Sequence, residues 1–499
     1  FIGNYNNLAG GNGGAIYLRN YDKPTIDIIT GDFIANKADG SGGAIYNVNK
    51  AEISLKTAVE GSKNYVTTFK NNSALNFGGA IYNTGDVHIM AANFTSNKTT
   101  STRAGSGGGA VYNDGKFVID NASVFTTNTA YDGGAIYNNT NGNMDLENVT
   151  IGDVKKAKNA NSSTHDGGAI YNKGTISIAI STLARNSAKN NGGLIFAAAG
   201  SKTVLGRHQV VEYNTAGNYG GAVYASGNLI LNKDSIASNL QFLSNSALAG
   251  GAIYADTSST LNISSTVFTS NNASTGDGGA IAFYNNGNGE AIYEDTAHNV
   301  YQGYIANQTL FENNTAKNGR GGAIYNKGNL YIADTTFRNN FAKEGGHIYN
   351  DANAILTLGD NVVFEFEAVG KTKYTYAELG GAIYNAGTLN FASGMTFEGL
   401  KSSGDGGVLY NAVGSTINRL ASATGTLALY NNTASNNGGA MYNMGTMTLS
   451  KTDIAGNTAA NGGGAIYNGG VLTINNSVTF SDNFANKSGG IIFNAKELY

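Results

Sequence analysis

GGAIYNKGNLYIADTTFRNNFAKEGG, residues 321–346, holds one complete copy of the unit from which this chain is built. The copy contains three partly apolar pieces: GGAIYN from Gly321, GNLYI from Gly328, and FRNN from Phe337. Apolar residues alternate in these pieces with a period near two, and glycine or asparagine bounds each piece. Because this period and these breakers are typical of β-strands, the unit predicts three short strands.

The first piece recurs along the chain as Gly-Gly-x-aliphatic-x. Seventeen copies are present, on average just under 30 residues apart, and the shortest spacings are 24 or 25 residues. We interpret the short spacing as the true period and the longer spacings as copies with insertions. The copies begin at Gly13, Gly42, Gly78, Gly108, Gly133, Gly167, Gly192, Gly220, Gly250, Gly278, Gly321, Gly345, Gly380, Gly406, Gly438, Gly463 and Gly489.

Three strands in a constant order, with no helical segment between copies, indicate a parallel β-helix in which each strand pairs with its equivalent one turn later. We expect an all-β solenoid of about 17–18 coils of roughly 25 residues each. It should form a single domain over residues 1–499, in which residues 280–320 are an insertion or a degenerate coil. One coil buries too few apolar side chains to fold alone, so stacking must supply the stability.

The aliphatic position of the Gly-Gly motif is Ile, Val, Leu or Met in every copy, which favours it as the residue that faces the core. Alanine before it and tyrosine after it would then face outward. In the alternative, the tyrosine rings stack inside, as the replacements Phe196 and Phe493 would permit. The tyrosine column consists of Tyr17, Tyr46, Tyr82, Tyr112, Tyr137, Tyr171, Tyr224, Tyr254, Tyr325, Tyr349, Tyr384, Tyr410, Tyr442 and Tyr467.

Asparagine recurs three residues after the phenylalanine of most copies. This residue tolerates left-handed backbone, and its amide can hydrogen-bond to the same amide in the neighbouring coils. The Gly-Gly pair fits a tight corner with positive φ. The chain contains a single proline, as expected where interior strands need every N–H for pairing.

The composition excludes several classes of function. The 499 residues include 70 Gly, 70 Asn, one Pro and no Cys, and the net charge is −3 with 13% charged residues. This charge supports no nucleic-acid partner, and the lack of cysteine excludes disulfides, thiolate zinc sites and iron–sulfur clusters. No apolar run reaches the length of a spanning helix, and the chain opens at Phe1 without a signal peptide. We expect a piece of a longer, secreted or surface-exposed polypeptide.

Possible catalytic groups occur at the corners. Asp132 and Asp166 precede Gly-Gly pairs in successive coils, which would place their carboxylates roughly 5 Å apart, as in a retaining glycosidase. His165 is beside them, but aspartate is also a common turn residue before glycine. His347 replaces the usual alanine of its copy and is expected to be an isolated surface residue. The five histidines show no ligand spacing, so we predict no catalytic, cofactor or metal site.

Charged and aromatic residues suggest other contacts. Arg320 and Glu344 occupy the same column one coil apart and are expected to form a weak ion pair. The longest spacing between copies, from Gly278 to Gly321, contains an acidic, tyrosine-rich loop, and residues 365–376 form a second aromatic loop. Aromatic rings with polar tips are frequent in protein and glycan interfaces. The candidate binding surface consists of Tyr284, Tyr293, Tyr301, Tyr304, Tyr325, Tyr349 and Tyr384.

The pairing of GGA[IVL] with FxxN, repeated from Phe1 to Phe493, resembles the polymorphic outer membrane proteins, a branch of the autotransporters. The resemblance implies a right-handed β-helical passenger that is exported through a C-terminal β-barrel and displayed on the bacterial outer membrane surface. This chain departs from the family pattern because it lacks the barrel and the cysteines that many such passengers contain. Any attachment to the membrane is therefore expected through the missing barrel alone.

We predict a cell-surface adhesin, not an enzyme, that attaches to a protein or glycan of host cells or other bacteria. Its extended repetitive surface would make many weak contacts, so affinity would grow with the number of coils engaged. A structural stalk or filament subunit, which self-associates end to end by β-helix stacking, is the alternative. A polysaccharide-active enzyme is the third hypothesis, because no concentrated cluster of charged residues is evident. No cofactor is expected.

Overall fold

The computed structural model describes residues 1–19, 25–48, 51–60, 63–232, 240–285, 287, 291–295, 299–366 and 377–499. Over these residues the chain is an all-β parallel β-helix of about 16 turns, with about 28 residues per turn and three parallel sheets. The predicted fold class is confirmed, and the insertions lengthen the average turn beyond the 25-residue period. The right-handed sense, implied by the family resemblance, stays a prediction.

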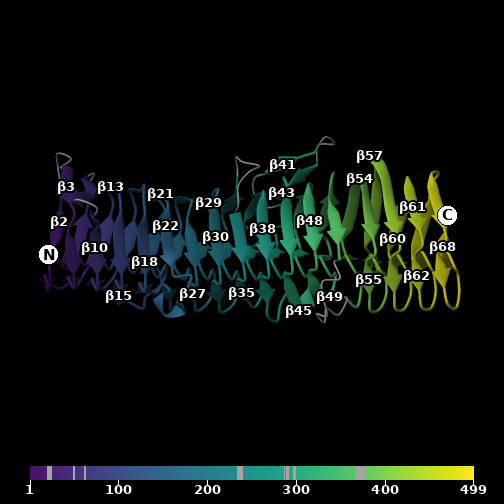
Figure 1. Ribbon diagram of the computed structural model, residues 1–499, viewed down its shortest axis with the longest axis horizontal. Coiled ribbons are helices and arrows are strands. Elements are labelled where there is room, and N and C mark those ends of the chain that lie inside the picture. The colour runs from purple at the N-terminus through teal and green to yellow at the C-terminus, as the bar shows by residue number, and fades with distance from the viewer. Residues whose placement is uncertain are drawn as a thin grey trace. The chain divides into compact units, whose positions relative to one another are not determined.

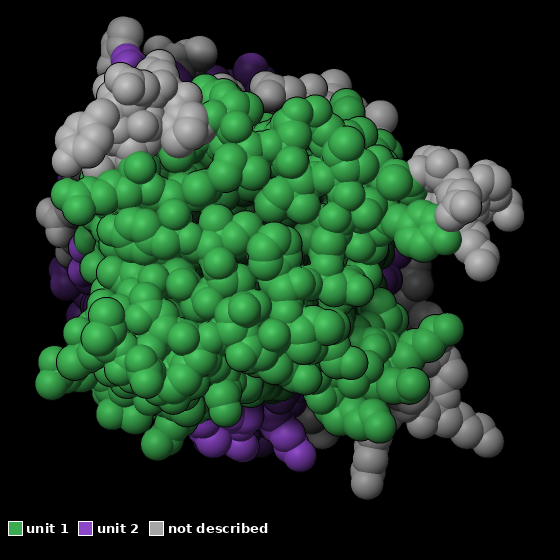
Figure 2. Space-filling model, turned by 90° about the vertical axis from the view of Figure 1, so that its left-hand side faces the viewer, with its two compact units in different colours: residues 1–247 green, residues 248–499 purple. Residues whose placement is uncertain are grey.

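The chain divides into two compact units, residues 1–247 and residues 248–499. Figure 1 shows each unit as successive windings of short strands. Figure 2 views unit 1, in green, from its first windings. The single domain expected over residues 1–499 stays a prediction.

One winding of unit 1 illustrates the repeat. It consists of β24 (Ile170–Asn172), β25 (Thr175–Ala179), β26 (Thr182–Ala184) and β27 (Ser187–Ala188). We expected three strands, but the third piece is divided into β26 and β27, because Arg185 between them adopts left-handed backbone with φ 59°. The strands β25 and β26 belong to one sheet, so four strands per winding form three sheets.

Each strand pairs in parallel with its equivalent in the next winding, so equivalent residues form columns. In the pairing of β24 with β28, Ile170 lies opposite Ile195 and Tyr171 lies opposite Phe196. The Gly-Gly strands of unit 1 are β2 (Ile16–Leu18), β6 (Ile45–Asn47), β12 (Ile81–Asn83), β16 (Val111–Asn113), β20 (Ile136–Asn138), β24, β28 (Ile195–Ala197) and β32 (Val223–Ala225). Those of unit 2 are β36 (Ile253–Ala255), β40 (Ile281–Phe283), β46 (Ile324–Asn326), β50 (Ile348–Asn350), β53 (Ile383–Asn385), β56 (Leu409–Asn411), β59 (Met441–Asn443), β63 (Ile466–Asn468) and β67 (Ile492–Asn494).

The two glycines of each copy have different functions. Gly167 has a φ of +62°, which L side chains rarely adopt, and it turns the chain into the strand. Gly168 lies so close to the next winding that an added Cβ would be 2.0 Å from the carbonyl oxygen of Gly193. The first glycine therefore makes the corner, and the second allows neighbouring windings to approach.

The aliphatic residue faces the core as predicted, since Ile170 has no exposed surface. Tyr171 lies on the opposite, outer face of the strand, which agrees with the expectation that the tyrosines face outward. The preceding alanine was expected to face outward, and this expectation is wrong, because Ala169 is completely buried. The N–H groups of Ala169 and Ile170 both donate to the carbonyl oxygen of Leu194, at 3.0 and 2.8 Å, so strand alternation has not yet begun at the alanine.

The asparagine after each phenylalanine forms the predicted ladder inside the windings. The Nδ2 of Asn128 donates to Oδ1 of Asn161 at 2.9 Å and to the carbonyl oxygen of Phe94 at 2.9 Å. We expected this asparagine to adopt the left-handed backbone. The left-handed residue is instead the one before it, such as Thr127 with φ 55°. The expectation is wrong because the amide must point along the column, whereas the turn is made one residue earlier.

A second asparagine ladder, which we did not predict, is formed by the last residue of the IYN strands. In unit 1 the Nδ2 of Asn113 donates to Oδ1 of Asn138 at 2.9 Å, and both residues are fully buried. Inside the windings the phenylalanine rings also stack, with centroids 4.9 Å apart for Phe69 and Phe94. Each winding is thus joined to the next by backbone pairing, buried amides and stacked rings.

Helical structure is scarce in the described residues. The 3₁₀ segment η1 (Ala157–Asn159) lies in the insertion that carries Lys155, Lys156 and Lys158. Within the described ranges, no helix has the length and apolar character needed to cross a membrane.

Candidate functional site

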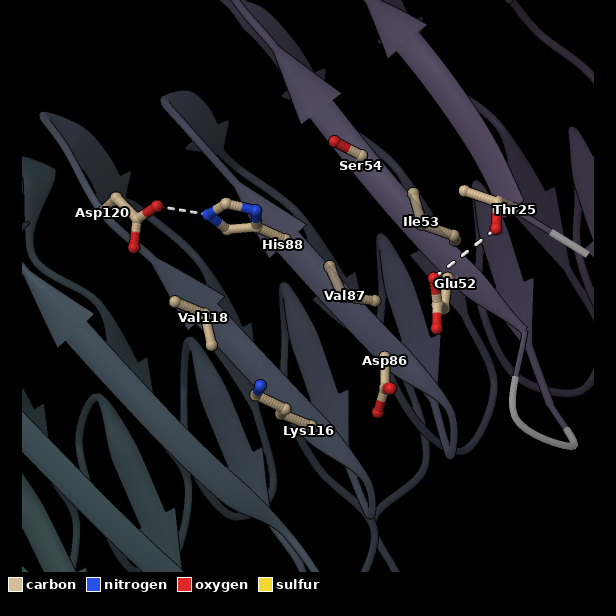
Figure 3. A pocket seen from close by; sticks show the side chains of 10 residues that line it. All are labelled: Thr25, Glu52, Ile53, Ser54, Asp86, Val87, His88, Lys116, Val118 and Asp120. Atoms are coloured by element: carbon tan, nitrogen blue, oxygen red, sulfur yellow. Dashed lines mark hydrogen bonds and ion pairs between the residues drawn. The ribbon is translucent and has the colours of Figure 1, made fainter. Parts of the chain in front are cut away.

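A groove of about 530 Å³ lies on the outer face of four neighbouring strands in unit 1 (Figure 3). The strands are β3 (Thr25–Ile29), β7 (Glu52–Lys56), β13 (Asp86–Ile89) and β17 (Lys116–Ile119). Alternate residues of these strands point into the core, which leaves the intervening polar residues to line the groove. The lining residues are Thr25, Glu52, Ile53, Ser54, Asp86, Val87, His88, Lys116, Val118 and Asp120.

Strand register decides how the charges of this groove are ordered. Glu52 and Lys116 lie in register with Asp86, on either side of it. Two carboxylates are therefore neighbours at the strand spacing of about 4.8 Å, with an ammonium group beyond them. His88 contacts the carboxylate of Asp120, and Figure 3 shows the two side chains directed toward one another.

The groove is open and carries hydrogen-bonding groups of both charges, so it suits a polar ligand such as a saccharide or a peptide segment. We did not predict it from the sequence. A signal is nevertheless present, since Glu52, Asp86 and Lys116 occupy the same position, the second residue, in the second piece of their copies. Aligning the copies would have placed these three charges in one column.

The tyrosine column forms a stacked ladder on the outside of the Gly-Gly strands. In unit 1, ring centroids are 4.6 Å apart for Tyr46 and Tyr82 and 4.9 Å apart for Tyr82 and Tyr112. Each ring therefore covers the face of its neighbour and leaves mainly an edge and a hydroxyl for any ligand. Burial raises the pKa of Tyr82 to about 12, so its hydroxyl stays protonated even at pH values where an exposed tyrosine ionises.

Four of the seven predicted binding residues belong to this ladder in unit 2. The ring centroids of Tyr325 and Tyr349 are 5.6 Å apart, and those of Tyr349 and Tyr384 are 4.7 Å apart. Tyr284 joins the column from a shifted position, because Ala282, which lies in register with Tyr254 and Tyr325, leaves a gap between those two rings. Tyr325 is 2% exposed and Tyr349 is 6% exposed, so these two rings offer little surface.

Hydroxyl groups of this part of the ladder already have partners. The Tyr325 hydroxyl donates to Oδ2 of Asp351 at 2.6 Å, and the Tyr349 hydroxyl accepts a hydrogen bond from Nη1 of Arg320 at 3.4 Å. Tyr384 is only partly buried. Tyr284 is also only partly buried, but its side chain already forms a hydrogen bond with Tyr254, so Tyr384 is the predicted ladder residue best placed for contact with a partner.

The other three predicted residues form a separate cluster in the insertion. The strands β41 (Tyr293–Glu294) and β42 (Val300–Tyr301) pair antiparallel, and the chain then returns to the windings in β43 (Gly303–Ala306). Tyr293 stacks on Tyr304 with centroids 4.4 Å apart. Tyr301 is 2% exposed, and its hydroxyl lies 3.1 Å from Oγ1 of Thr357. These rings hold the hairpin against the sheet, and Tyr301 is unavailable to a ligand.

Three further sequence-based expectations concern the second aromatic loop, Arg320 and His347. Of the second aromatic loop, residues 367–376 lie outside the described residues. Arg320 lies in register with Glu344, and its guanidinium donates to both carboxylate oxygens of Asp277 on the other side, at 3.1 and 2.8 Å. The prediction that His347 is a surface residue is wrong, because the corner position that it occupies is buried and the side chain is completely enclosed.

Asp132 and Asp166 are close, as their positions in successive windings predicted, and the structure brings His165 to both of them. The His165 Nδ1 lies 2.9 Å from Oδ1 of Asp132 and 3.1 Å from Oδ2 of Asp166. Burial raises the pKa of both carboxyl groups, and the neighbouring imidazole opposes the rise. The His165 ring also stacks on Tyr131, with centroids 4.8 Å apart.

Three stretches of the chain, residues 66–84, 308–327 and 451–469, match the Chlamydia polymorphic membrane protein repeat. The probable autotransporter YfaL of Escherichia coli (strain K12) is 34% identical over 177 residues, which cover 34% of this chain and 14% of that protein. The probable outer membrane protein PmpG of Chlamydia muridarum (strain MoPn / Nigg) is 30% identical over 270 residues, which cover 46% of this chain and 26% of that protein.

These matches confirm the resemblance to the polymorphic membrane proteins and the autotransporters. No solved structure matches the chain significantly. The chain spans about a seventh of one curated relative and about a quarter of the other.

Proposed function

We propose that the chain is part of a surface-displayed passenger that attaches a bacterium to host cells or to other bacteria. The chain is a passenger-like β-helix, and the relatives that it matches are named as autotransporter and outer membrane proteins. That likeness supports a location at the outer membrane surface, and the partner that we propose is a protein or glycan.

The observation that carries the proposal is the outer face of the windings. Identical side chains recur there at the strand spacing, so one weak contact can be repeated along the unit and affinity can grow by multivalency. The groove of unit 1 adds a polar site with two adjacent carboxylates and a lysine. A hydroxyl-rich ligand suits this site, because carboxylates accept its hydrogen bonds and lysine donates others.

Attachment can be tested with the purified chain on cultured cells, on bacteria and on glycan arrays. Replacing Glu52 by Gln and Asp86 by Asn in one variant should weaken binding at least about tenfold, as expected when about 1.4 kcal/mol of interaction is lost. The matched control is Glu147→Gln, because Glu147 is exposed on the strand β21 (Asn143–Glu147) of the same sheet and does not line the groove.

A second variant should test the ladder. Tyr384→Phe keeps the stacked ring and removes only the hydroxyl, so weaker binding would assign the contact to the ladder edge. Unchanged binding by both variants would remove the groove and the ladder from the proposal. A chain that binds no cell, bacterium or glycan would contradict the adhesive role itself. Release of reducing ends from a polysaccharide would instead favour an enzyme.

A further inference from the structure

The column of residues before the Gly-Gly pairs collects acidic side chains, and two of them have a local partner. Asp277 accepts two hydrogen bonds from the Arg320 guanidinium, one on each carboxylate oxygen. Asp405 accepts hydrogen bonds from the backbone N–H and from Nδ2 of Asn437, both at 3.0 Å. A single carboxylate at a corner is therefore balanced by the residue of the next winding.

Asp132 and Asp166 differ because they occupy the corners of consecutive windings. Their side chains are only 4% and 9% exposed, so two carboxylates share one buried position. Two buried carboxylates that both stay ionised require compensating positive charge. The basic side chain that contacts both carboxylates is His165, which can carry at most one positive charge.

The distances from His165 to the two carboxylates are close to those between metal ligands. Around a tetrahedral Zn²⁺ with bonds of about 2.0–2.1 Å, neighbouring donor atoms lie about 3.3 Å apart. The His165 Nδ1 lies 2.9 Å from one carboxylate oxygen and 3.1 Å from the other. Among the described residues, these form the one group of three His, Cys, Asp or Glu donors within 4.8 Å of one another.

The surroundings orient the two carboxylates. Oδ2 of Asp132 accepts a hydrogen bond from the N–H of Gly105 at 3.3 Å. Oδ1 of Asp166 accepts hydrogen bonds from the N–H and the Nδ2 of Asn191, both at 3.0 Å. Oδ1 of Asp132 and Oδ2 of Asp166 face the imidazole, and Oδ1 of Asp132 also accepts a hydrogen bond from the N–H of Asp166 at 3.3 Å. Such outer hydrogen bonds are typical of metal sites, where they fix the ligand orientation.

We propose that Asp132, His165 and Asp166 bind a divalent transition-metal ion of the Zn²⁺ type. A divalent ion balances both carboxylates, which a single imidazolium cannot do. One nitrogen and two oxygen donors suit Zn²⁺ or Co²⁺ better than Ca²⁺, which takes six to eight oxygen ligands. The His165 side chain is 36% exposed, so the ion can enter from solvent and a water molecule can complete the coordination.

The proposal can be tested by titrating the untagged chain with ZnCl₂ by calorimetry and with CoCl₂ by visible absorption. We expect one Zn²⁺ per chain at this site and a Co²⁺ spectrum of low-coordinate type. Asp132→Asn should weaken binding by more than the roughly 10–100-fold that loss of an outer hydrogen-bonding partner costs, and Asn191→Ala should fall within that range. The Asp132→Asn variant should fold, because Asn12, Asn191 and Asn437 occupy equivalent corners.

Two controls make the test specific. Asp405→Asn changes an equivalent corner that has a single carboxylate, and His88→Ala removes the exposed histidine–carboxylate pair with Asp120; neither should alter the high-affinity binding. Zn²⁺ should also raise the unfolding temperature of the wild type and not of Asp132→Asn. Equal binding by wild type and Asp132→Asn, or no binding at all, would overturn the proposal. That outcome would leave His165 as a hydrogen-bonding partner of the two carboxylates.

Discussion

His347 lies at a position that alanine occupies in most copies, and its side chain is enclosed by the winding. Its Nδ1 is 3.1 Å from Nδ2 of Asn340, and its ring centroid lies 6.2 Å from that of Phe337 and 5.6 Å from that of Phe364. Burial lowers the pKa of His347 to about 3, because the charged imidazolium would lose its hydration. The folded chain therefore holds a neutral histidine.

This buried histidine should make stability depend on pH. The unfolded chain binds a proton at His347 below its ordinary pKa of about 6.5, whereas the folded chain does so only near pH 3, so stability falls as the pH decreases from 6.5 toward 3. Between pH 7 and pH 5 the loss should be about 2 kcal/mol. Urea unfolding of the wild type and of His347→Ala at both pH values would measure the difference.

The control for this experiment is His208→Asn. His208 is exposed and has a left-handed φ of 53°, which asparagine tolerates. This variant should keep the pH dependence of the wild type, whereas His347→Ala should reduce it even if the lost ring volume lowers stability at pH 7. The same slope in all three proteins would contradict a neutral, buried His347.

Among the structural elements, the asparagine ladders connect windings through side chains. Asn128 contributes four hydrogen bonds to its ladder. Its Nδ2 donates to Asn161 and Phe94, and its Oδ1 accepts from the N–H and Nδ2 of Asn97, at 3.0 and 3.1 Å. In the second ladder, alanine occurs naturally at Ala197 and Ala225, so that ladder tolerates interruption.

Removing an amide should therefore cost more in the first ladder than in the second. Asn128→Ala removes four buried hydrogen bonds, to Asn161, Phe94 and Asn97, at about 0.5–1.5 kcal/mol for each bond, so we expect a loss of about 3 kcal/mol. The matched variant Asn113→Ala should cost less. Denaturant unfolding of the two variants would compare them, and equal losses would show that the two ladders have the same energetic weight.

At the scale of the whole molecule, equivalent residues form columns. The smallest piece that can be removed without disturbing these columns is therefore one complete winding. Leu409 lies opposite Met441, and Met441 lies opposite Ile466. If the winding that contains Met441 is removed, Leu409 therefore still has an aliphatic residue, Ile466, as its neighbour in the column. Removal of residues 438–462, which is 25 residues, joins Asn437 directly to the Gly-Gly pair at Gly463.

We expect this deletion to give a soluble, folded chain, because Leu409 would then pair with Ile466 in the register that the parent already uses. Far-ultraviolet circular dichroism per residue should be unchanged. Deletion of residues 438–449 is the control, since loss of about half a winding joins unlike strands. It should give an unfolded or aggregated chain. A folded half-winding deletion would show that column register does not determine the fold.

The repeat also decides how much of the candidate site could be foreseen. Asp132 and Asp166 were predicted to be close because their positions relative to Gly-Gly are the same in successive copies. The position of His165 between them was not predicted, because a residue beside a corner can point to either side. The groove was missed for a related reason: Glu52, Asp86 and Lys116 lie in separate copies and meet only when those copies are in register.

The sequence by itself determined the strand period, the parallel β-helical fold, the inward aliphatic column and the resemblance to polymorphic membrane proteins. These follow from spacings within one copy or from recurrence of one motif, which are local properties of the chain. Only the tertiary structure decided that the corner alanine and His347 are buried, that a second asparagine ladder exists, and that Asp132, His165 and Asp166 share one point. Those features depend on backbone direction at the corners and on contacts between windings, which no single copy encodes.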